Sequence, residues 1–150
     1  ATYGVSHLLA NMVDLGKWEK RVDGEIHLTL TGWDRTDYAF LKKRRDIVVL
    51  QMANPDVTDE IVAQLEGSMM LKELDLNDTA VTDASLPILA SIPNLKILRL
   101  RGTKITDQGF REHLLGKESL LSVDLRETAV ASKTLREWKK EKPADRQYLK

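Results

Sequence analysis

The chain is 150 residues long, 42% hydrophobic and 31% charged, which is the composition of an ordinary globular domain. Its formal net charge is zero, so no overall field directs it to nucleic acid or to an anionic membrane. Cysteine is absent, which excludes disulfide bonds and thiolate chemistry, and no apolar run approaches the ~18 residues of a membrane span. We therefore expect a soluble domain, in a compartment that the sequence does not indicate.

A helix is predicted at the start of the chain, over residues 3–15. Four apolar residues there have the i, i+3, i+4, i+7 spacing of one helical face, and Gly16 stands where the helix would end. They are Val5, Leu8, Leu9 and Met12. We expect residues 1–22 to form an N-terminal cap helix and a linker, which would cover one end of the core.

Two tryptophans lie near this end, Trp18 and Trp33. Trp buries more area than most side chains, so we expect both to fill the capping core rather than to form a platform for a ligand. The chain begins at Ala1 instead of Met, which suggests a processed protein or a fragment of a longer one.

Four segments repeat the apolar pattern L-x-x-L-x-L at intervals of 24 or 25 residues. A fixed period in this range indicates a repeat architecture. The pattern residues are Ile47, Leu50 and Met52, then Leu71, Leu74 and Leu76, then Leu95, Leu98 and Leu100, and finally Leu120, Val123 and Leu125. A weaker copy precedes them, with Ile26 and Leu28 in the last two apolar positions and two extra residues in its turn.

In three repeats a Thr-Asp pair follows six residues after the last apolar position, and the other two copies vary this feature. The pairs are Thr58-Asp59, Thr82-Asp83 and Thr106-Asp107, with Ala131-Ser132 in the fourth copy and Thr36-Asp37 in the weak one. The alternating L-x-L part predicts a strand with one buried face, and the apolar spacing after the pair predicts a helix. We expect the Asp of each pair, and Ser132, to be the helix N-cap.

The combined pattern L-x-x-L-x-L-x-x-T-x-[VI]-T-D, over about residues 25–138, resembles the leucine-rich repeat family and its cysteine-containing and ribonuclease-inhibitor-like groups. The resemblance implies an α/β solenoid, a right-handed curved superhelix with a parallel sheet on its concave face and helices on its convex face. Three threonines stand where those groups often keep Asn or Cys, and we expect them to hydrogen-bond buried backbone. They are Thr79, Thr103 and Thr128. Pro55 breaks the pattern, so the turn of its repeat is expected to differ.

We predict a single domain over residues 1–150. Behind the N-terminal cap, the predicted units are a degenerate repeat at 23–46, repeats at 47–70, 71–94 and 95–119, and a last repeat with a C-terminal cap or tail at 120–150. Trp138 stands in the last helix where other copies have Leu, so it is expected to close the core, with Pro143 ending the helix. The tail beyond this point is expected to pack loosely.

The sequence offers no residue set that catalysis or metal binding requires. The segment from Asp75 to Asp83 faintly matches a calcium loop, but Ala80 stands where that loop needs Gly and Leu86 where it needs Glu. The three histidines lie in different repeats without ligand spacing. No nucleophile elbow, phosphate-binding glycine loop or cysteine nucleophile occurs. We predict that this chain is not an enzyme and uses no cofactor.

Two basic stretches, Lys42–Arg45 and residues 133–150, raise the alternative of a weak nucleic-acid binder. The second contains seven Lys or Arg and three Asp or Glu. We favour a helix end and a solvated tail, because cations complement a helix C-terminus and no aromatic residues interleave with the run. A steep loss of affinity with salt would reveal phosphate binding.

The residues between the leucines are the candidate partner-binding residues, because they point away from the core. The eight candidates are Gln51, Glu73, Asp75, Asn77, Arg99, Arg101, Asp124 and Arg126. Neighbouring strands lie ~4.8 Å apart, so Asp75, Arg99 and Asp124 are expected to form a row of alternating charge, which His27 and Gln51 extend. Such a row either satisfies itself or presents a hydrogen-bonding surface to a partner.

Arg101 and Arg126 are predicted to lie on adjacent strands with only Asn77 beside them. Stability alone would not select such a like-charge pair, and an acidic group of a partner could bridge both. Exchanging both for Ser is then expected to weaken partner binding while leaving the melting temperature nearly unchanged.

The predicted function is that of a non-catalytic interaction module or scaffold, which binds another protein or a peptide through the concave strand face. The alternative is an accessory or regulatory domain of an enzyme whose catalytic part lies outside this chain. Five short repeats offer a small surface compared with the ~800 Å² per partner of a standard interface. Binding is therefore expected to be modest or shared with neighbouring domains.

Overall fold

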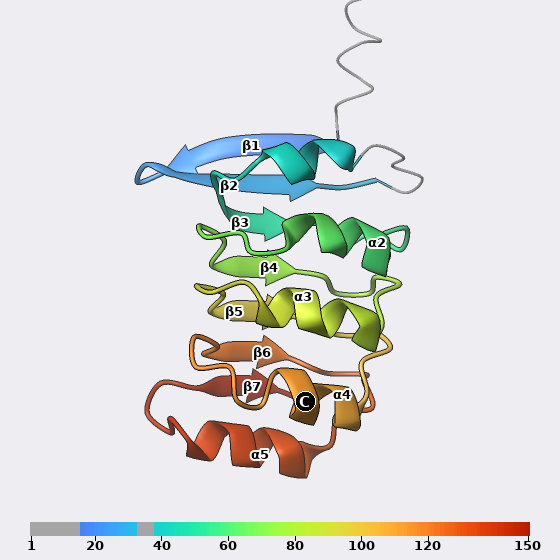
Figure 1. The fold of residues 1–150 in the computed structure, drawn as a ribbon, viewed down its shortest axis with the longest axis vertical. Coiled ribbons are helices and arrows are strands. Elements are labelled where there is room, and N and C mark those ends of the chain that lie inside the picture. The colour runs from blue at the N-terminus through green and yellow to red at the C-terminus, as the bar shows by residue number, and fades with distance from the viewer. Residues whose placement is uncertain (1–15, 33–37) are drawn as a thin grey trace, which may run out of the picture.

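The computed structural model describes residues 16–32 and 38–150, and its strands form one sheet (Figure 1). The strands are β1 Lys17–Val22, β2 Glu25–Leu30, β3 Ile47–Gln51, β4 Glu73–Asp75, β5 Ile97–Arg99, β6 Ser122–Asp124 and β7 Gln147–Leu149. They lie in the sheet in chain order, from β1 to β7. The cap helix predicted over residues 3–15 falls outside the described residues, as do Trp33 and the pair Thr36-Asp37.

From β2 onward each strand pairs in parallel with the next. Leu74 lies beside Leu98, and Leu98 lies beside Val123. The register predicted for the four regular repeats is therefore confirmed. Because equivalent side chains meet on neighbouring strands, each repeat adds one layer to a shared apolar core.

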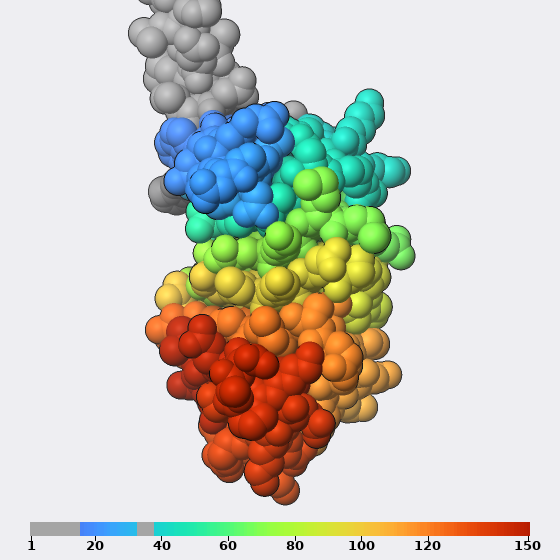
Figure 2. Space-filling model, turned by 90° about the vertical axis from the view of Figure 1, so that its left-hand side faces the viewer, coloured from blue at the N-terminus to red at the C-terminus, as the bar shows by residue number. Residues whose placement is uncertain are grey.

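Short helices cover one face of the sheet and enclose this core (Figure 1). They are the 3-10 helices η1 Ala39–Lys43, η2 Ala63–Leu65 and η3 Asp83–Ser85, and the α-helices α2 Asp59–Val62, α3 Leu86–Ala90, α4 Asp107–His113 and α5 Ser132–Lys140. Leu74, Leu98 and Leu125 are completely buried between the two layers. The space-filling view shows the repeats as successive bands in chain order (Figure 2). The α/β layering agrees with the prediction, and the curvature stays a prediction.

The weak first repeat lies two residues away from its predicted alignment. The pairing of β2 with β3 places Leu28 beside Leu50, so Leu30 takes the last apolar position. His27 therefore does not enter the row predicted for it, and Thr29 takes its place. The apolar residues of β2 alternate over three positions, so the alternation by itself is compatible with two registers.

An antiparallel hairpin, not a linker, precedes the first repeat. β1 pairs with β2 across a turn in which Asp23 and Gly24 have φ of 52° and 82°. Asp-Gly is favoured in two-residue hairpin turns because both residues must adopt the left-handed region. The prediction for Trp18 is wrong, since its side chain is 56% exposed on β1 rather than packed in a core. The large area of a Trp ring was an insufficient reason to bury it, because Trp18 lies beside Thr29, on the side of the sheet opposite the buried Leu28 and Leu30.

The C-terminal segment continues the sheet, so the prediction of a loosely packed tail is wrong. β7 pairs with β6 and places Tyr148 beside Val123. Arg146 is buried, and its guanidinium donates to three main-chain carbonyl oxygens at 2.7–3.0 Å and lies 4.6 Å from the ring centre of Trp138. Burial lowers the pKa of Arg146. Trp138 is completely buried in α5 and closes the core as predicted.

The Thr-Asp pairs link each repeat to the next. The Asp59 carboxylate accepts hydrogen bonds from the main-chain N–H and the hydroxyl of Thr82, at 2.8 and 2.7 Å. Asp83 accepts the same two bonds from Thr106. We call this column of Asp59, Thr82, Asp83, Thr106 and Asp107 the Thr–Asp ladder. It ties the starts of consecutive helices together.

The prediction that the Asp of each pair is the N-cap is wrong, because Thr82 and Thr106 occupy that position. A hydroxyl can donate to the Asp of the preceding repeat and accept an N–H of its own helix at once, whereas a carboxylate only accepts. At the end of the ladder, Asp107 accepts the hydroxyl of Thr134 and the main-chain N–H of Ala131. These hydrogen bonds, helped by Arg111, hold the pKa of Asp107 below its usual value.

The threonines of the turns hydrogen-bond the backbone as predicted. Each donates its hydroxyl to the carbonyl oxygen three residues earlier, at 2.6–2.8 Å. The donors are Thr79, Thr103 and Thr128. The repeat that contains Pro55 differs, also as predicted. There the side chain of Asn54 donates at 2.9 Å to the carbonyl oxygen of Leu30, in the preceding repeat.

Candidate partner-binding face

The sheet face that the helices leave uncovered is the candidate site, and we call it the outer face. The strand register sets two rows of outward side chains across it. Row A consists of Trp18, Thr29, Gln51, Asp75, Arg99, Asp124 and Leu149. Row B consists of Lys20, His27, Val49, Glu73, Ile97, Ser122 and Gln147. Adjacent members of a row lie within reach of one another.

All eight predicted candidates lie on the outer face or in the turns that follow its strands. Gln51, Asp75, Arg99 and Asp124 belong to row A, and Glu73 belongs to row B. Three further candidates follow row A in the turns, and these are Asn77, Arg101 and Arg126. The repeat register thus brings the eight residues together along one side of the sheet.

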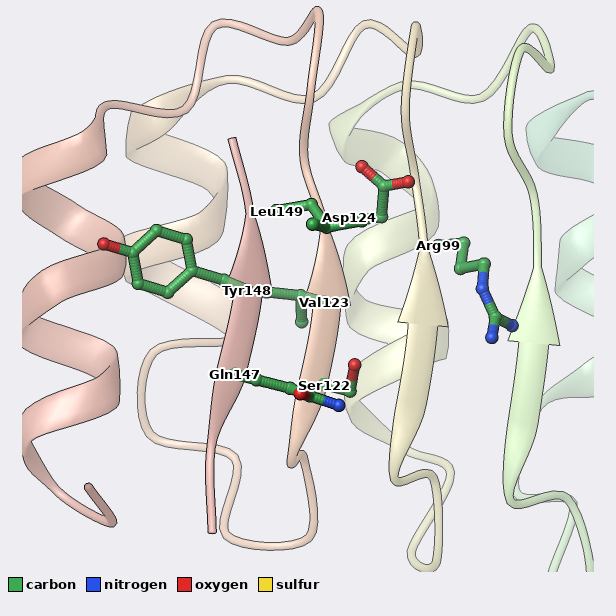
Figure 3. Close-up of a pocket in the computed structure, with 7 residues that line it drawn as sticks. All are labelled: Arg99, Ser122, Val123, Asp124, Gln147, Tyr148 and Leu149. Atoms are coloured by element: carbon green, nitrogen blue, oxygen red, sulfur yellow. The ribbon is translucent and has the colours of Figure 1, made fainter. Parts of the chain in front are cut away.

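Row A places the predicted charges side by side, but Arg99 forms its ion pair diagonally, with Glu73 of row B. Asp75, Arg99 and Asp124 are direct neighbours in the register. The Nη1 atom of Arg99 lies 2.6 Å from Oε1 of Glu73. Figure 3 shows the Arg99 side chain directed to the neighbouring strand and away from Asp124. The alternating row is therefore not a chain of salt bridges between neighbours.

Asp124 is a buried carboxylate, with only 3% of the residue exposed. Nε and Nη2 of Arg126 donate to it at 2.9 and 2.6 Å, and the main-chain N–H of Arg126 donates at 3.2 Å. Burial alone would raise the pKa of Asp124, but the hydrogen bonds from Arg126 outweigh it and hold the pKa below its usual value. The positive charge of Arg126 therefore compensates the buried negative charge of Asp124.

Arg101 also has a carboxylate of its own. Its Nη2 atom lies 2.6 Å from Oδ2 of Asp78, an exposed ion pair. The two arginines follow each other on adjacent turns, where the main-chain N–H of Gly102 donates to the carbonyl oxygen of Arg126. The prediction that only Asn77 lies beside them is wrong, because Asp78 of the preceding turn pairs with Arg101 and Asp124 of β6 pairs with Arg126. Neither arginine needs an acidic group from a partner.

Asp75 differs from the other carboxylates of this region. Its Oδ1 atom accepts the main-chain N–H of Asn77 at 3.0 Å, and the side-chain oxygen of Asn77 in turn accepts the N–H of Arg101 at 2.8 Å. Among the residues that the structure describes, no cation forms an ion pair with Asp75. The side chain of Asn77 therefore stabilises the turn, whereas Asp75 is a half-buried carboxylate without a counterion in the described part of the chain.

Described residues of the outer face line several hollows. One, of about 230 Å³, is lined at the C-terminal end by residues that include Arg99, Ser122, Gln147 and Leu149 (Figure 3). A second, of about 210 Å³, lies beside Asp75, and a third, of about 290 Å³, lies beside Trp18. The second and third share Thr29 in their linings.

The basic run ends a 3-10 helix, as predicted. Lys42 and Lys43 form its last turn. Arg44 pairs with Glu19 at 2.7 Å and with Asp46 at 2.9 Å. Arg45 donates to the carbonyl oxygen of Glu66 and to the hydroxyl of Ser68. Two of the four cations are thus engaged within the protein.

Trp18, Thr29 and Leu149 belong to the outer face but were missing from the predicted set. The Asp-Gly turn signal could have revealed the hairpin that carries Trp18. Tyr148 lies 25 residues after Val123, the same spacing that separates Val123 from Leu98, and this signal could have placed Leu149.

No metal site emerges from this geometry. Across residues 16–32 and 38–150, no group of His, Asp and Glu side chains is arranged to hold a metal ion.

Comparison with known proteins agrees with the repeat geometry. A sequence model of the leucine-rich repeat matches residues 67–86 and 91–111. The chain is a leucine-rich repeat protein. A search of curated proteins finds no match to this leucine-rich repeat protein. Its placement among the ribonuclease-inhibitor-like repeats stays a prediction. In the described part of the chain, every helix is too short or too polar to cross a membrane.

Proposed function

We propose that this leucine-rich repeat protein is a non-catalytic interaction module that binds another protein or a peptide through its outer face. The observation that carries the proposal is the contrast between inward and outward positions of the same strands. Inward positions of neighbouring strands repeat one kind of residue, as at Leu50, Leu74, Leu98 and Val123. Leucine-rich repeats generally mediate protein–protein interaction, which supports the same conclusion.

Outward positions change at every step. Row A runs from an amide at Gln51 to a carboxylate at Asp75, a guanidinium at Arg99 and a second carboxylate at Asp124. A stack of repeats needs constancy only in its core, so the outward residues are free to carry specificity. The proposal applies equally to a free-standing chain and to a domain that regulates an attached enzyme.

Photo-crosslinking tests the proposal. A benzoylphenylalanine replaces Gln51 or Gln147 on the outer face in two variants, and Glu60 or Arg136 on the helix side in two controls; all four residues are exposed. In cells of the source organism, the outer-face variants are expected to form an adduct with the same partner, and the controls are expected to form none. Adducts from the helix side alone would overturn the proposal.

A further inference from the structure

We infer that the N-terminal half of the outer face binds an extended peptide segment that carries a basic side chain and, about four residues away, an apolar one. This inference rests on the proposed function and specifies the chemistry of the partner. It is built on Trp18, Thr29, Gln51 and Asp75, which are consecutive members of row A.

We expect the basic side chain of the peptide to contact Asp75. Three neighbouring carboxylates already face an arginine each: Glu73 faces Arg99, Asp78 faces Arg101, and Asp124 faces Arg126. Among the residues that the structure describes, Asp75 has only the main-chain N–H of Asn77, at its Oδ1 atom. A half-buried carboxylate with free acceptor sites favours a cation, because charge-assisted hydrogen bonds to ammonium or guanidinium groups are the strong ones.

The space beside Asp75 is suited to such a group. The hollow of about 210 Å³ is lined mainly by polar or small residues and reaches from Thr29 past Gln51 to Asp75. This volume is several times the ~30 Å³ that one water occupies, so it admits the end of a long side chain. Gln51 accepts the hydroxyl of Thr29 through its oxygen at 2.9 Å. Its amide nitrogen has no hydrogen-bond partner within residues 16–32 and 38–150, so it can donate to a carbonyl group of the peptide.

We expect the apolar side chain of the peptide to contact Trp18. Its side chain is 56% exposed and borders the hollow of about 290 Å³. An exposed aromatic residue next to a concave surface is a typical anchor of protein interfaces. Glu19 and Lys20 line the same hollow, and Glu19 is already paired with Arg44 at 2.7 Å. The charge of Lys20 would therefore repel a second cation of the peptide there. An apolar group suffers no such repulsion.

The distance between the two contacts sets the spacing in the peptide. Trp18 and Asp75 are separated by three strand steps along row A. Three steps of ~4.8 Å amount to about 14 Å, and an extended chain advances ~3.3 Å per residue. A peptide that crosses the strands along row A therefore places side chains about four residues apart over the two sites.

The test is a selection of random, cysteine-free decapeptides displayed on phage against the full chain. Selections run in parallel on the wild type, on Asp75→Asn, on Trp18→Ser and on Glu60→Gln. Asn at position 75 retains an oxygen for the N–H of Asn77 and removes only the charge, and Glu60→Gln removes an equal charge from the helix side. Circular dichroism melting curves establish that each variant is folded.

The wild type and Glu60→Gln are expected to enrich peptides with Lys or Arg and an apolar residue four positions apart. Asp75→Asn is expected to lose the basic preference, with at least tenfold weaker binding of the selected peptides by fluorescence anisotropy. Trp18→Ser is expected to lose the apolar preference. Enrichment of acidic peptides, or of basic peptides that bind Asp75→Asn unchanged, would overturn the inference.

A further variant separates this inference from the proposed function. Gln51→Trp places a bulky side chain in the middle of row A. If acidic peptides are selected and Gln51→Trp blocks them, the inference fails and the outer face remains a binding site. If peptides are selected that no outer-face variant affects, or none is enriched, the inference fails; the crosslinking experiment then decides the proposed function by itself.

Discussion

The Thr–Asp ladder and row A are two polar columns that run through the same repeats and have opposite properties. In the ladder the residues repeat, and Asp59, Asp83 and Asp107 each accept hydrogen bonds from the following repeat. In row A the residues change at every strand. Asp75 and Asp83 belong to one repeat and are chemically identical. Among the described residues the first has no counterion and accepts one main-chain N–H, whereas the second accepts two hydrogen bonds from Thr106 of the next repeat.

The comparison shows how a repeat protein separates stability from recognition. A polar group that recurs at the repeat period can be satisfied by its own copy in the next repeat, so it stabilises the stack. A polar group that varies has no such copy to meet. It either forms an ion pair with a nearby side chain, as Asp124 does with Arg126, or lacks a counterion among the described residues, as Asp75 does.

The largest expected effect comes from breaking the ladder with Asp59→Ala. Asp59 accepts three hydrogen bonds, two from Thr82 and one from the hydroxyl of Ser85 at 2.6 Å. Their loss is expected to lower the free energy of unfolding by about 2–4 kcal/mol, measured by urea denaturation. The matched control, Glu60→Ala, alters an exposed neighbour and is expected to have little effect. Equal losses in both variants would contradict a structural role for the ladder.

Acid should weaken the ladder through Asp107. The pKa of Asp107 in the folded protein lies below its usual value, so the unfolded chain binds the proton more readily. Its contribution to stability is therefore complete above the unfolded pKa and is lost as the pH falls through the folded pKa. In urea titrations from about pH 5 downward, Asp107→Asn is expected to lose stability less steeply than the wild type. An unchanged slope would show that Asp107 does not contribute.

Within the outer face, Arg126→Ser is expected to destabilise the protein because it leaves a buried carboxylate. This replaces the expectation from the sequence that loss of this arginine leaves the melting temperature nearly unchanged. The side chain of Asp124 is 4% exposed, so without Arg126 its burial would raise the pKa. A fall in melting temperature of roughly 2–8 °C is expected at neutral pH, and it should diminish on acidification as Asp124 takes up a proton. A melting temperature equal to that of the wild type at both pH values would contradict this reading of the pair.

The smallest effect is expected from Arg101→Ser. Its partner Asp78 has a side chain that is 52% exposed, and ion pairs in water contribute little. The shift in melting temperature is expected to be less than half that of Arg126→Ser. The two variants form a matched pair, since each removes one arginine from an equivalent turn. A larger shift for Arg101→Ser would show that exposure of the carboxylate does not decide the outcome.

The sequence predicted the regular repeats because burial at Leu74, Leu98 and Val123 leaves a strict period. It misplaced β2, where alternating apolar residues allow two registers. The spacing of six residues from Leu30 to Thr36 matches that from Met52 to Thr58 and would have selected the correct one.

The contacts of the site were less predictable than its residues. Register placed the eight candidates on one side of the sheet, but ion pairs depend on side-chain direction. Arg99 turns to row B, and Arg126 folds back onto its own strand. The counterion of Arg101 comes from Asp78, which has a positive φ of 59° in the turn. The same conformation recurs one period later at Gly102 and again at Glu127, so the turn is periodic. The acidic residue that pairs with Arg101 is not part of the repeated pattern, so periodicity did not reveal the pair.

The central claim is that a partner protein or peptide contacts row A and does not contact the Thr–Asp ladder. Amide chemical shifts recorded while a basic decapeptide from the wild-type selection is titrated into the protein test it most directly. The amides of Gln51 and Asp75 are expected to shift, and those of Thr82 and Thr106 are expected to stay in place. Shifts centred on the ladder amides, with Gln51 and Asp75 unmoved, would contradict the claim.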